Sequence, residues 1–418
     1  MSYITTYKPA KGASISLDQM LGSTVDISVC RKPRPYPGTV TRRCETPPYA
    51  QGDVRRLIEL LKRLPYIHTP RNLHKEYKIY TIPKRSGGER KICAPSETLY
   101  RDQVTLRTLF EKEFFASYHT TAFAYCKGRN SKRCLQRHQA NKSRWFLKLD
   151  FEDFFGNTSK EFVMQQLANI APFSEVIKHE DGKQALSDAI NICFLNNGLP
   201  QGTPISPMLT NLIMIPFDHE INRILHAKGF VYTRYADDIQ ISHKDKFIPG
   251  EIVNLIKLQL RSMNMPYRLK TAKTRFGSSS GKNWNLGLML NNENRITIGH
   301  INHKLMKARL HSFAMDFMHH KPWSMSDVQK LAGQWAYFKS IEPLTADYIM
   351  IQLSNKLRID IAALIKLSLS GRPMLTPNEM LFGSLEDRLQ VCRMVNQEAE
   401  RMLQEAIALY KRSHNESN

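Results

Sequence analysis

Two adjacent carboxylates, Asp237 and Asp238, stand between two short apolar segments, and this arrangement constrains the fold more than any other feature of the chain. Segments 231–235 and 239–242 on either side carry β-branched and aromatic residues, which is typical of the two strands of a hairpin. Two like charges at a tight turn repel each other, so a bound cation would explain them. Because Asp is also common in ordinary turns, a solvated turn is the alternative.

A third carboxylate, Asp150, lies upstream at the end of an apolar run of strand length, Trp145 to Leu149. If this strand faces the hairpin, three carboxylates come together. Magnesium prefers carboxylate oxygens, and two such ions can stabilise both the attacking and the leaving oxygen of an in-line phosphoryl displacement. The alternative for Asp150 is a helix N-cap following the strand.

Five segments follow in the order and wording of the motifs of bacterial reverse transcriptases, a group that includes the retrons, the group II intron enzymes and the phage-defence enzymes. They are 82–95, 122–130, Asp150 with Phe155, 198–202 and 235–238. This resemblance implies an α+β right-hand polymerase with fingers, a palm with an antiparallel sheet and a helical thumb. The expected domains are an N-terminal arm (1–52), fingers (53–145), palm (146–299), thumb (300–372) and a C-terminal helical extension (373–418).

The resemblance also assigns the catalytic residues. It implies that Asp150 and Asp237 are direct ligands of two Mg²⁺ ions, and that Asp238 is a third carboxylate which shapes the site more than it binds metal. Phe151 is included with the aspartates in the metal site. The expected reaction is attack by a primer 3′-hydroxyl on the α-phosphate of a deoxynucleoside triphosphate.

Two cations, Lys84 and Arg90, flank the turn 86–88, so a hairpin could present both of them to the triphosphate. Arg offers a planar fork to phosphate oxygens and Lys a point charge. A solvated hairpin tip is the alternative. The run 198–207 contains three prolines and two glycines, which predicts an irregular loop, and by resemblance Gln201 in this loop contacts the nucleotide.

Two further nucleotide contacts are predicted. By resemblance, the ring of Phe155 lies against the sugar and would collide with a 2′-hydroxyl, which favours deoxynucleotides; a core aromatic is the alternative. Lys273, in a lysine-bearing motif after the hairpin, could act near the leaving pyrophosphate as a general acid or as a stabilising charge. Lys270 is its close rival.

The chain of 418 residues has a net charge of +22, and the positive charge is unevenly placed. Segment 127–148 contains eight Lys or Arg residues and no acidic residue. Such a cluster can be a solvated face, but its self-repulsion favours a polyanion as partner. The predicted nucleic-acid contacts are Lys127, Arg129, Lys132, Arg133 and Arg137.

The remaining segments indicate how the chain is organised into arm, helices and extension, and they contain no further candidate site residues. The proline- and arginine-rich N-terminus suggests an extended arm, and the pattern after residue 300 is helical. An apolar stripe over 385–409 suggests a long helix that packs on the thumb, with self-association into a homo-oligomer or RNA docking as alternatives. No Cys-x-x-Cys pair, signal-peptide core or membrane-length apolar run occurs, so we expect no zinc site, no membrane contact and a cytoplasmic protein.

The sequence therefore predicts an RNA-directed DNA polymerase that copies a cognate structured non-coding RNA into cDNA, with antiviral defence against bacteriophage as its expected role. One alternative is a retron enzyme that makes a branched RNA–DNA hybrid. Others are an RNA-binding scaffold with weak polymerase activity and an RNA-dependent RNA polymerase, which Phe155 disfavours.

Overall fold

The computed structural model describes residues 51–69, 71–83, 87–114, 116–280, 286–321, 323–370 and 401. The expected arm before residue 51 and, apart from Arg401, the expected C-terminal extension lie outside these ranges. The chain divides into two compact units: the first runs to Leu286 with Asn292–Asn294, and the second comprises Gly287–Asn291 and the chain from Arg295 onward. The bounds of the five domains expected from the sequence remain predictions.

The first unit is built around a four-stranded antiparallel sheet in the order β4-β5-β3-β6. The strands are β3 (Trp145–Asp150), β4 (Val231–Tyr235), β5 (Asp238–His243) and β6 (Arg275–Ser278). The predicted hairpin and the predicted strand ending at Asp150 are both confirmed. They are neighbours in the sheet, because β5 pairs with β3 as well as with β4.

The two faces of this sheet differ in character, since successive side chains of a strand point to opposite faces. Buried Leu147, Leu149, Ile239 and Ile241 lie on one face and join the main hydrophobic core. The alternate positions of the same strands, on the other face, carry polar side chains: Lys148, Asp150, Asp238 and Gln240. Burial of the apolar face fixes the register and so fixes which carboxylates face one another.

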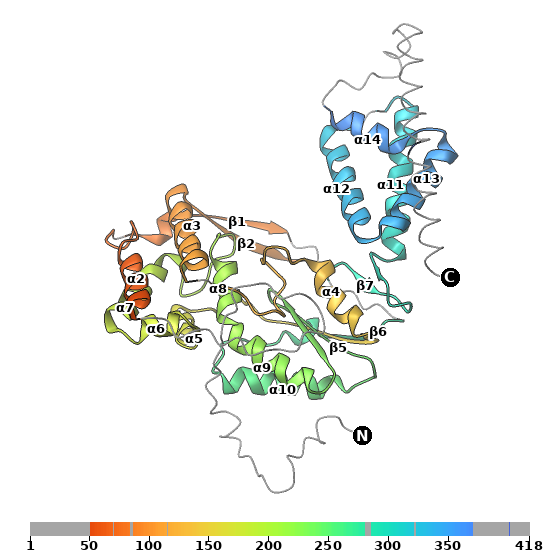
Figure 1. Ribbon diagram of the computed structural model, residues 1–418. Coiled ribbons are helices and arrows are strands. Elements are labelled where there is room, and N and C mark those ends of the chain that lie inside the picture. Colours follow the sequence, from red (N-terminus) through yellow and green to blue (C-terminus); the bar gives the residue numbers. More distant parts are fainter. Residues whose placement is uncertain are drawn as a thin grey trace, which may run out of the picture. The chain divides into compact units, whose positions relative to one another are not determined.

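Helices cover both faces of the sheet. On the apolar side lie α8 (Ser206–Ile213), α9 (Ile215–His226) and α10 (Pro249–Ser262), whose apolar residues belong to the same core. Figure 1 shows α9 and α10 running beside the sheet. On the polar side lies α4 (Ser131–Ala140), whose buried His138 contacts Thr233 and Ser242.

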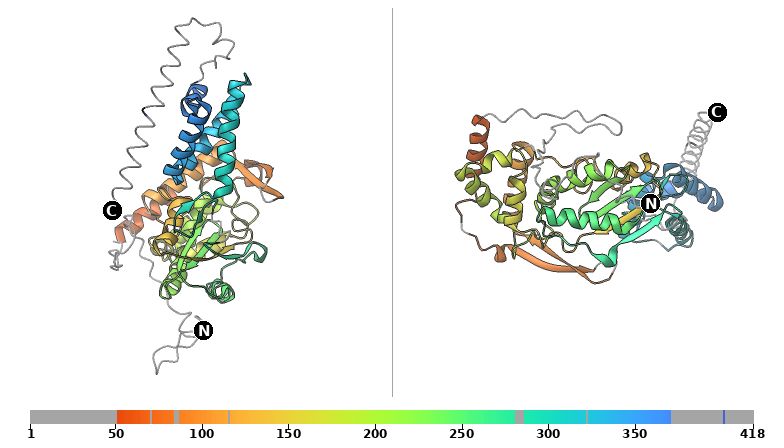
Figure 2. Two further views of the ribbon diagram at one scale, coloured as in Figure 1. Left: turned by 90° about the vertical axis from the view of Figure 1, so that its right-hand side faces the viewer. Right: turned by 90° about the horizontal axis from the view of Figure 1, so that it is seen from below.

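The rest of the first unit carries a long two-stranded hairpin that stands out from the remainder (orange in Figures 1 and 2). It pairs Tyr77 with Pro95 at one end and Pro83 with Glu89 at the other, as the sequence predicted. The strands and helices of this region are β1 (Tyr77–Pro83), β2 (Glu89–Pro95), α2 (Gln51–Lys62), α3 (Glu97–Lys112), α5 (Lys160–Leu167), α6 (Phe173–Ile177) and α7 (Glu180–Ile190).

The second unit is helical, as expected after residue 300. Its elements are β7 (Met289–Leu290), β8 (Ile296–Thr297), α11 (His300–Met318), α12 (Met325–Ile341), α13 (Pro343–Leu357) and α14 (Ile361–Leu369). Glu342, between α12 and α13, accepts hydrogen bonds from Thr297 Oγ1 and the Ile298 N–H at 3.0 and 2.7 Å, so the start of α11 is anchored to the helices that follow. Within the described ranges, no helix is both long enough and apolar enough to cross a membrane.

Candidate active site

The three predicted carboxylates lie together at one end of the central sheet. Asp150, the last residue of β3, is directly opposite Asp238, the first residue of β5. The N–H of Phe151 donates to the carbonyl oxygen of Asp237 at 3.1 Å, which ties the turn between β4 and β5 to the end of β3. Asp150 is in a strand, and the next helix begins at Lys160 with Ser159 as its N-cap. The helix-cap alternative for Asp150 is therefore wrong.

Two lysines neutralise part of this negative charge. The amine of Lys273 lies 2.9 and 2.7 Å from the two carboxylate oxygens of Asp150. The amine of Lys148 lies 3.1 Å from Oδ1 of Asp238. Lys148 is two residues before Asp150 on β3, so both side chains point to the same face of the sheet. The third carboxylate, Asp237, has no such ion pair with either amine.

The electrostatics of the turn reflect this crowding. Burial raises the pKa of the Asp237 carboxyl above its usual range, and the neighbouring charges of Asp238 and Asp150 raise it further. Burial also raises the pKa of Asp238, although Lys148 opposes the shift. For Lys273, partial burial lowers the pKa, but bonding to Asp150 outweighs it, so the pKa is raised overall. The site favours bound cations.

The donor set suits a hard divalent ion, since it offers carboxylate oxygens and a surplus of negative charge at Asp237. Among the described residues, no group of three or more His, Cys, Asp or Glu side chains is already arranged to hold a metal ion. The Asp150 carboxylate is bonded to Lys273, so an ion at its oxygens would share them with the amine or displace it. The ring of Phe151 is buried against Phe154 and Tyr267, so only its backbone carbonyl could contribute to the predicted metal site.

Lys273 reaches the site through the segment after α10. The N–H of Lys270 donates to the carbonyl oxygen of Asp150 at 2.8 Å, and the short helix η3 (Thr271–Lys273) then brings the amine of Lys273 back to the Asp150 carboxylate. Of the two rival lysines, Lys273 is thus the one whose side chain contacts a carboxylate of the site, while Lys270 takes part through its backbone.

The predicted nucleotide residues Phe155 and Gln201 lie on two touching loops. The N–H of Leu199 donates to the Phe155 carbonyl at 3.0 Å, and the N–H of Cys93 on β2 donates to the Gln201 carbonyl at 2.8 Å. A Cβ on Gly198 would lie 2.3 Å from the carbonyl oxygen of Gly156, so only glycine permits this approach. The irregular loop predicted from the prolines is confirmed, and it joins the sheet to the β1–β2 hairpin.

Of the two predicted cations of that hairpin, the structure describes only Arg90. Arg90 lies on β2, three residues before Cys93, and is exposed. Lys84 lies outside the described residues. The triphosphate role of both remains a prediction.

Part of the basic segment 127–137 has a structural role. Arg129 Nη1 donates to the carbonyl oxygens of His119 and Ala122, both at 2.6 Å. The Arg133 guanidinium donates to the carbonyl of Gly128, and that of Arg137 lies 5.7 Å from the centre of the Phe123 ring. Lys127 is exposed and Lys132 half-buried. These contacts order the segment, and its role in binding nucleic acid remains a prediction.

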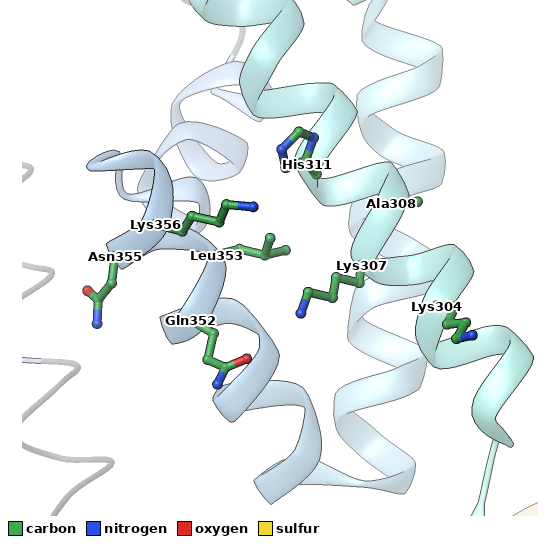
Figure 3. A pocket seen from close by; sticks show the side chains of 8 residues that line it. All are labelled: Lys304, Lys307, Ala308, His311, Gln352, Leu353, Asn355 and Lys356. Carbon is green, nitrogen blue, oxygen red and sulfur yellow. The ribbon is translucent and has the colours of Figure 1, made fainter.

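The second unit carries a basic groove of about 640 Å³ between α11 and α13. Its lining contains no acidic residue: Lys304, Lys307, Ala308, His311, Gln352, Leu353, Asn355 and Lys356. Figure 3 shows the amines of Lys307 and Lys356 pointing into the space between the helices, while Asn355 points away from it. The groove thus offers two cations to an anion from opposite walls.

Three residues that the sequence does not single out lie at the carboxylates or beneath their turn: Lys148, Arg234 and Asp218. Lys148 was counted only as part of the basic segment, although its position two residues before Asp150 on a strand was a usable signal. Arg234 and Asp218, an ion pair completely buried beneath the turn, gave no comparable signal, since they belong to different elements.

Comparisons with known proteins agree with this arrangement. The model of the reverse transcriptase (RNA-dependent DNA polymerase) family matches residues 82–313, more than half of the chain. The retron Ec73 reverse transcriptase of Escherichia coli is 29% identical over 277 residues, covering 64% of this chain and 83% of that protein. The retron Ec83 reverse transcriptase of the same organism is 28% identical over 293 residues, with coverages of 68% and 86%.

Among solved structures, a telomerase of Candida tropicalis in complex with a fragment of telomeric RNA matches 80% of this chain and 64% of its own at 11% identity and a TM-score of 0.39.

The chain belongs to the reverse transcriptase family. It is a retron-like RNA-directed DNA polymerase with an α+β right-hand fold, and it binds an RNA template. Polymerases of this family depend on a metal ion.

Proposed function

We propose that this polymerase extends a primer with deoxynucleotides at the site formed by Asp150, Asp237 and Asp238, with Mg²⁺ as its metal. The observation that carries the proposal is the strand register that sets Asp150 opposite Asp238 and beside the turn of Asp237. Two Mg²⁺ ions, when bound, would supply positive charge for the attacking and the leaving oxygen of the phosphoryl transfer.

The residues around the carboxylates have separate roles in this proposal. Asp150 and Asp237 hold the ions, together with the carbonyl of Phe151, and Lys148 keeps Asp238 largely out of the metal shell. The amine of Lys273, 2.7 Å from Asp150, would turn to the phosphates when an ion takes its place and would stabilise their charge.

The nucleotide would lie between the two touching loops and the β1–β2 hairpin. Gln201 contacts it from one loop, and the ring of Phe155 excludes a 2′-hydroxyl from the other. Lys84 and Arg90 bind its triphosphate from the hairpin.

A test is to replace Asp237 and Asp238 together with Asn. We expect primer extension on an RNA template with Mg²⁺ and deoxynucleotides to fall at least about 1,000-fold, since electrostatic stabilisation is usually the largest part of such catalysis. RNA affinity, measured at one salt concentration, should stay within a few-fold. The matched control is Glu152→Gln with Asp153→Asn, two exposed carboxylates just after β3, which should polymerise normally. Undiminished synthesis by the first variant would contradict the proposed site.

We further propose that the template is a cognate structured non-coding RNA and that the cDNA serves antiviral defence. The basic segment 127–137 and the groove between α11 and α13 both offer phosphate-binding cations. The retron relatives favour a second candidate, synthesis of a branched RNA–DNA hybrid. Self-association into a homo-oligomer also stays a proposal.

Sequencing the RNA and cDNA that copurify with the protein distinguishes these two products. Repeated or long cDNA from one small RNA supports the first, and a 2′–5′ branched molecule supports the second. The role in defence is tested by phage plating on cells that carry the wild-type protein or the Asp237→Asn/Asp238→Asn variant with the native locus. Equal plating efficiencies would contradict it.

A further inference from the structure

Arg234 has the largest side chain that is completely buried among the described residues, and its partner Asp218 on α9 is also completely buried. Removing two charges from water costs so much that apolar residues of similar size are often equally stabilising. Stability alone therefore does not account for the pair, and the geometry of the remaining guanidinium bonds becomes informative.

Asp218 orients the guanidinium of Arg234. Its two oxygens accept from Nε at 2.9 and 3.2 Å and from Nη2 at 2.7 Å. The hydroxyl of Tyr232 donates to the same carboxylate at 2.7 Å. The remaining nitrogen, Nη1, donates to the carbonyl oxygen of Ala236 at 3.0 Å and to Oδ1 of Asn211 at 3.2 Å. Asp218 on α9 thus holds the edge of the guanidinium formed by Nε and Nη2. The third nitrogen, Nη1, points toward the turn that contains Ala236.

The backbone of Ala236 needs stabilising contacts because its φ is +57°. This is a left-handed conformation that residues other than glycine rarely adopt. Ala236 directly precedes Asp237 and Asp238 and is buried. The bond from Arg234 fixes one side of this turn. On the other side, the N–H of Phe151 holds the Asp237 carbonyl at 3.1 Å.

The backbone of Arg234 joins the turn to the segment that leads into the basic residues. Its N–H donates to the Thr121 carbonyl at 2.9 Å, and its carbonyl accepts from the Phe123 N–H at 2.8 Å. Asn211 on α8 donates to the Ala124 carbonyl at 2.7 Å. Arg234 thereby connects the turn to three parts of the first unit: its side chain bonds α9 and α8, and its backbone bonds the segment 121–123.

We propose that Arg234, oriented by Asp218, is a positioning residue that holds the Ala236 carbonyl and thereby places the Asp237 and Asp238 carboxylates for catalysis. This inference rests on the proposed catalytic role of those aspartates. The arginine itself is completely buried, so its proposed effect on catalysis is indirect.

The main test replaces the buried polar group as a unit with apolar residues of similar size: Asp218→Leu, Tyr232→Phe and Arg234→Met. Both charges and the hydroxyl are removed together, and only two neutral acceptors, Asn211 Oδ1 and the Ala236 carbonyl, lose a donor. We therefore expect a folded protein whose melting temperature is lowered only by the loss of these two hydrogen bonds. We expect kcat for deoxynucleotide addition to fall by roughly 10- to 100-fold, the effect of a displacement of about 1 Å, with the nucleotide KM changed less than about threefold. Mn²⁺ affinity without nucleotide, measured by electron paramagnetic resonance, should weaken by about threefold or more.

A second variant and a matched control complete the test. Arg234→Lys keeps the charge beside Asp218, but a lysine lacks the planar fork, so it should fold and show the same loss in kcat. The control is Arg223→Met with Glu220→Leu, an arginine–carboxylate pair on α9, the helix that carries Asp218. The Arg223 Nε and Nη2 donate to the two Glu220 oxygens at 2.8 and 2.6 Å. The control should polymerise and bind Mn²⁺ normally.

The outcomes separate the inference from the proposed function. Wild-type kcat and Mn²⁺ affinity in a folded variant of either kind would overturn the positioning role. The positioning role would also be overturned if, in both variants, activity fell only in proportion to the amount of folded protein, because the ion pair would then be purely structural. If the Asp237→Asn/Asp238→Asn protein stayed active, the proposed site itself would be wrong, whatever the Arg234 variants did.

Discussion

Lys273 holds Asp150 by both carboxylate oxygens, at 2.9 and 2.7 Å, although 123 residues separate them in the chain. Metal coordination by Asp150 and this ion pair use the same oxygens. In the proposed mechanism, a metal ion on this carboxylate would compete with the amine, which would then turn to the phosphates of the nucleotide. The proposal thus couples metal binding to the positive charge that the substrate meets.

Replacing Lys273 with Ala should change metal binding and catalysis in opposite directions. The side chain is about half exposed (47%), so its ion pair is modest, and we expect Mn²⁺ affinity without nucleotide to rise by roughly two- to fivefold. The single-turnover rate of deoxynucleotide addition should fall by about 100-fold or more, because the phosphates lose a cation. Paramagnetic resonance titration and rapid quench measure the two effects. Lys257→Ala, an exposed lysine on α10, is the control, and unchanged or weaker Mn²⁺ binding would refute the competition.

Replacing Phe155 with Ala should relax the choice of sugar. The ring is half-buried, and if it fills the space of a 2′-hydroxyl, its removal should reduce discrimination between deoxy- and ribonucleotides by roughly 10- to 200-fold. The ratio of kcat/KM for the two substrates measures the change. Phe155→Tyr, which keeps the bulk, should discriminate as the wild type does. Equal discrimination by the Ala variant would show that the ring is only a core aromatic.

Replacing Gly198 with Ala should displace the loop of Gln201. The new Cβ would lie 2.3 Å from the Gly156 carbonyl, a backbone atom that moves only with its chain. We expect a loss of about 1–3 kcal/mol in the free energy of unfolding and a higher KM for deoxynucleotides. Gly250→Ala on α10 meets nothing within 4 Å and is the control. A normal KM in the Gly198 variant would mean that the loop does not contact the nucleotide.

The buried His138 predicts a pH dependence of stability. Its ring nitrogens lie 2.6 Å from Ser242 Oγ and 2.9 Å from Thr233 Oγ1, and burial lowers its pKa to about 3. In the unfolded chain, where the pKa of His is near 6.5, this ring binds a proton at about pH 5, whereas in the folded protein it stays neutral. Stability therefore falls as the pH drops below about 6.5, by about 2 kcal/mol at pH 5.

Chemical denaturation at pH 5 and pH 7 measures this loss, and His138→Gln should reduce it by about that amount. His226→Gln, at an exposed position of α9, should leave it unchanged. If the His138 variant lost as much stability as wild type, the neutral buried ring would not be its cause.

Much of the candidate site follows from the sequence. The turn residues Asp237 and Asp238 lie between apolar segments that can only be buried as a hairpin, and Asp150 ends a strand of the same kind. Local periodicity and residue type determine such elements, because each strand must bury one face. The family and the polymerase fold can also be predicted from the sequence, because the motifs of the family are short, contiguous segments.

The partners of the carboxylates were decided by the tertiary structure. Lys148 meets Asp238 because the register of β3 against β5 puts both on one face, and Lys273 meets Asp150 because the backbone of Lys270 pairs with the end of β3. Neither contact is visible in the spacing of the residues along the chain.

The sequence by itself thus determined the fold class, the strands and the aspartates of the candidate site. Only the tertiary structure decided how those aspartates are held: by two lysines that balance their charge, and by Arg234 beneath the turn. The physical reason is that the energy of an ion pair depends on distance and burial, and both arise only when distant segments have packed against one another.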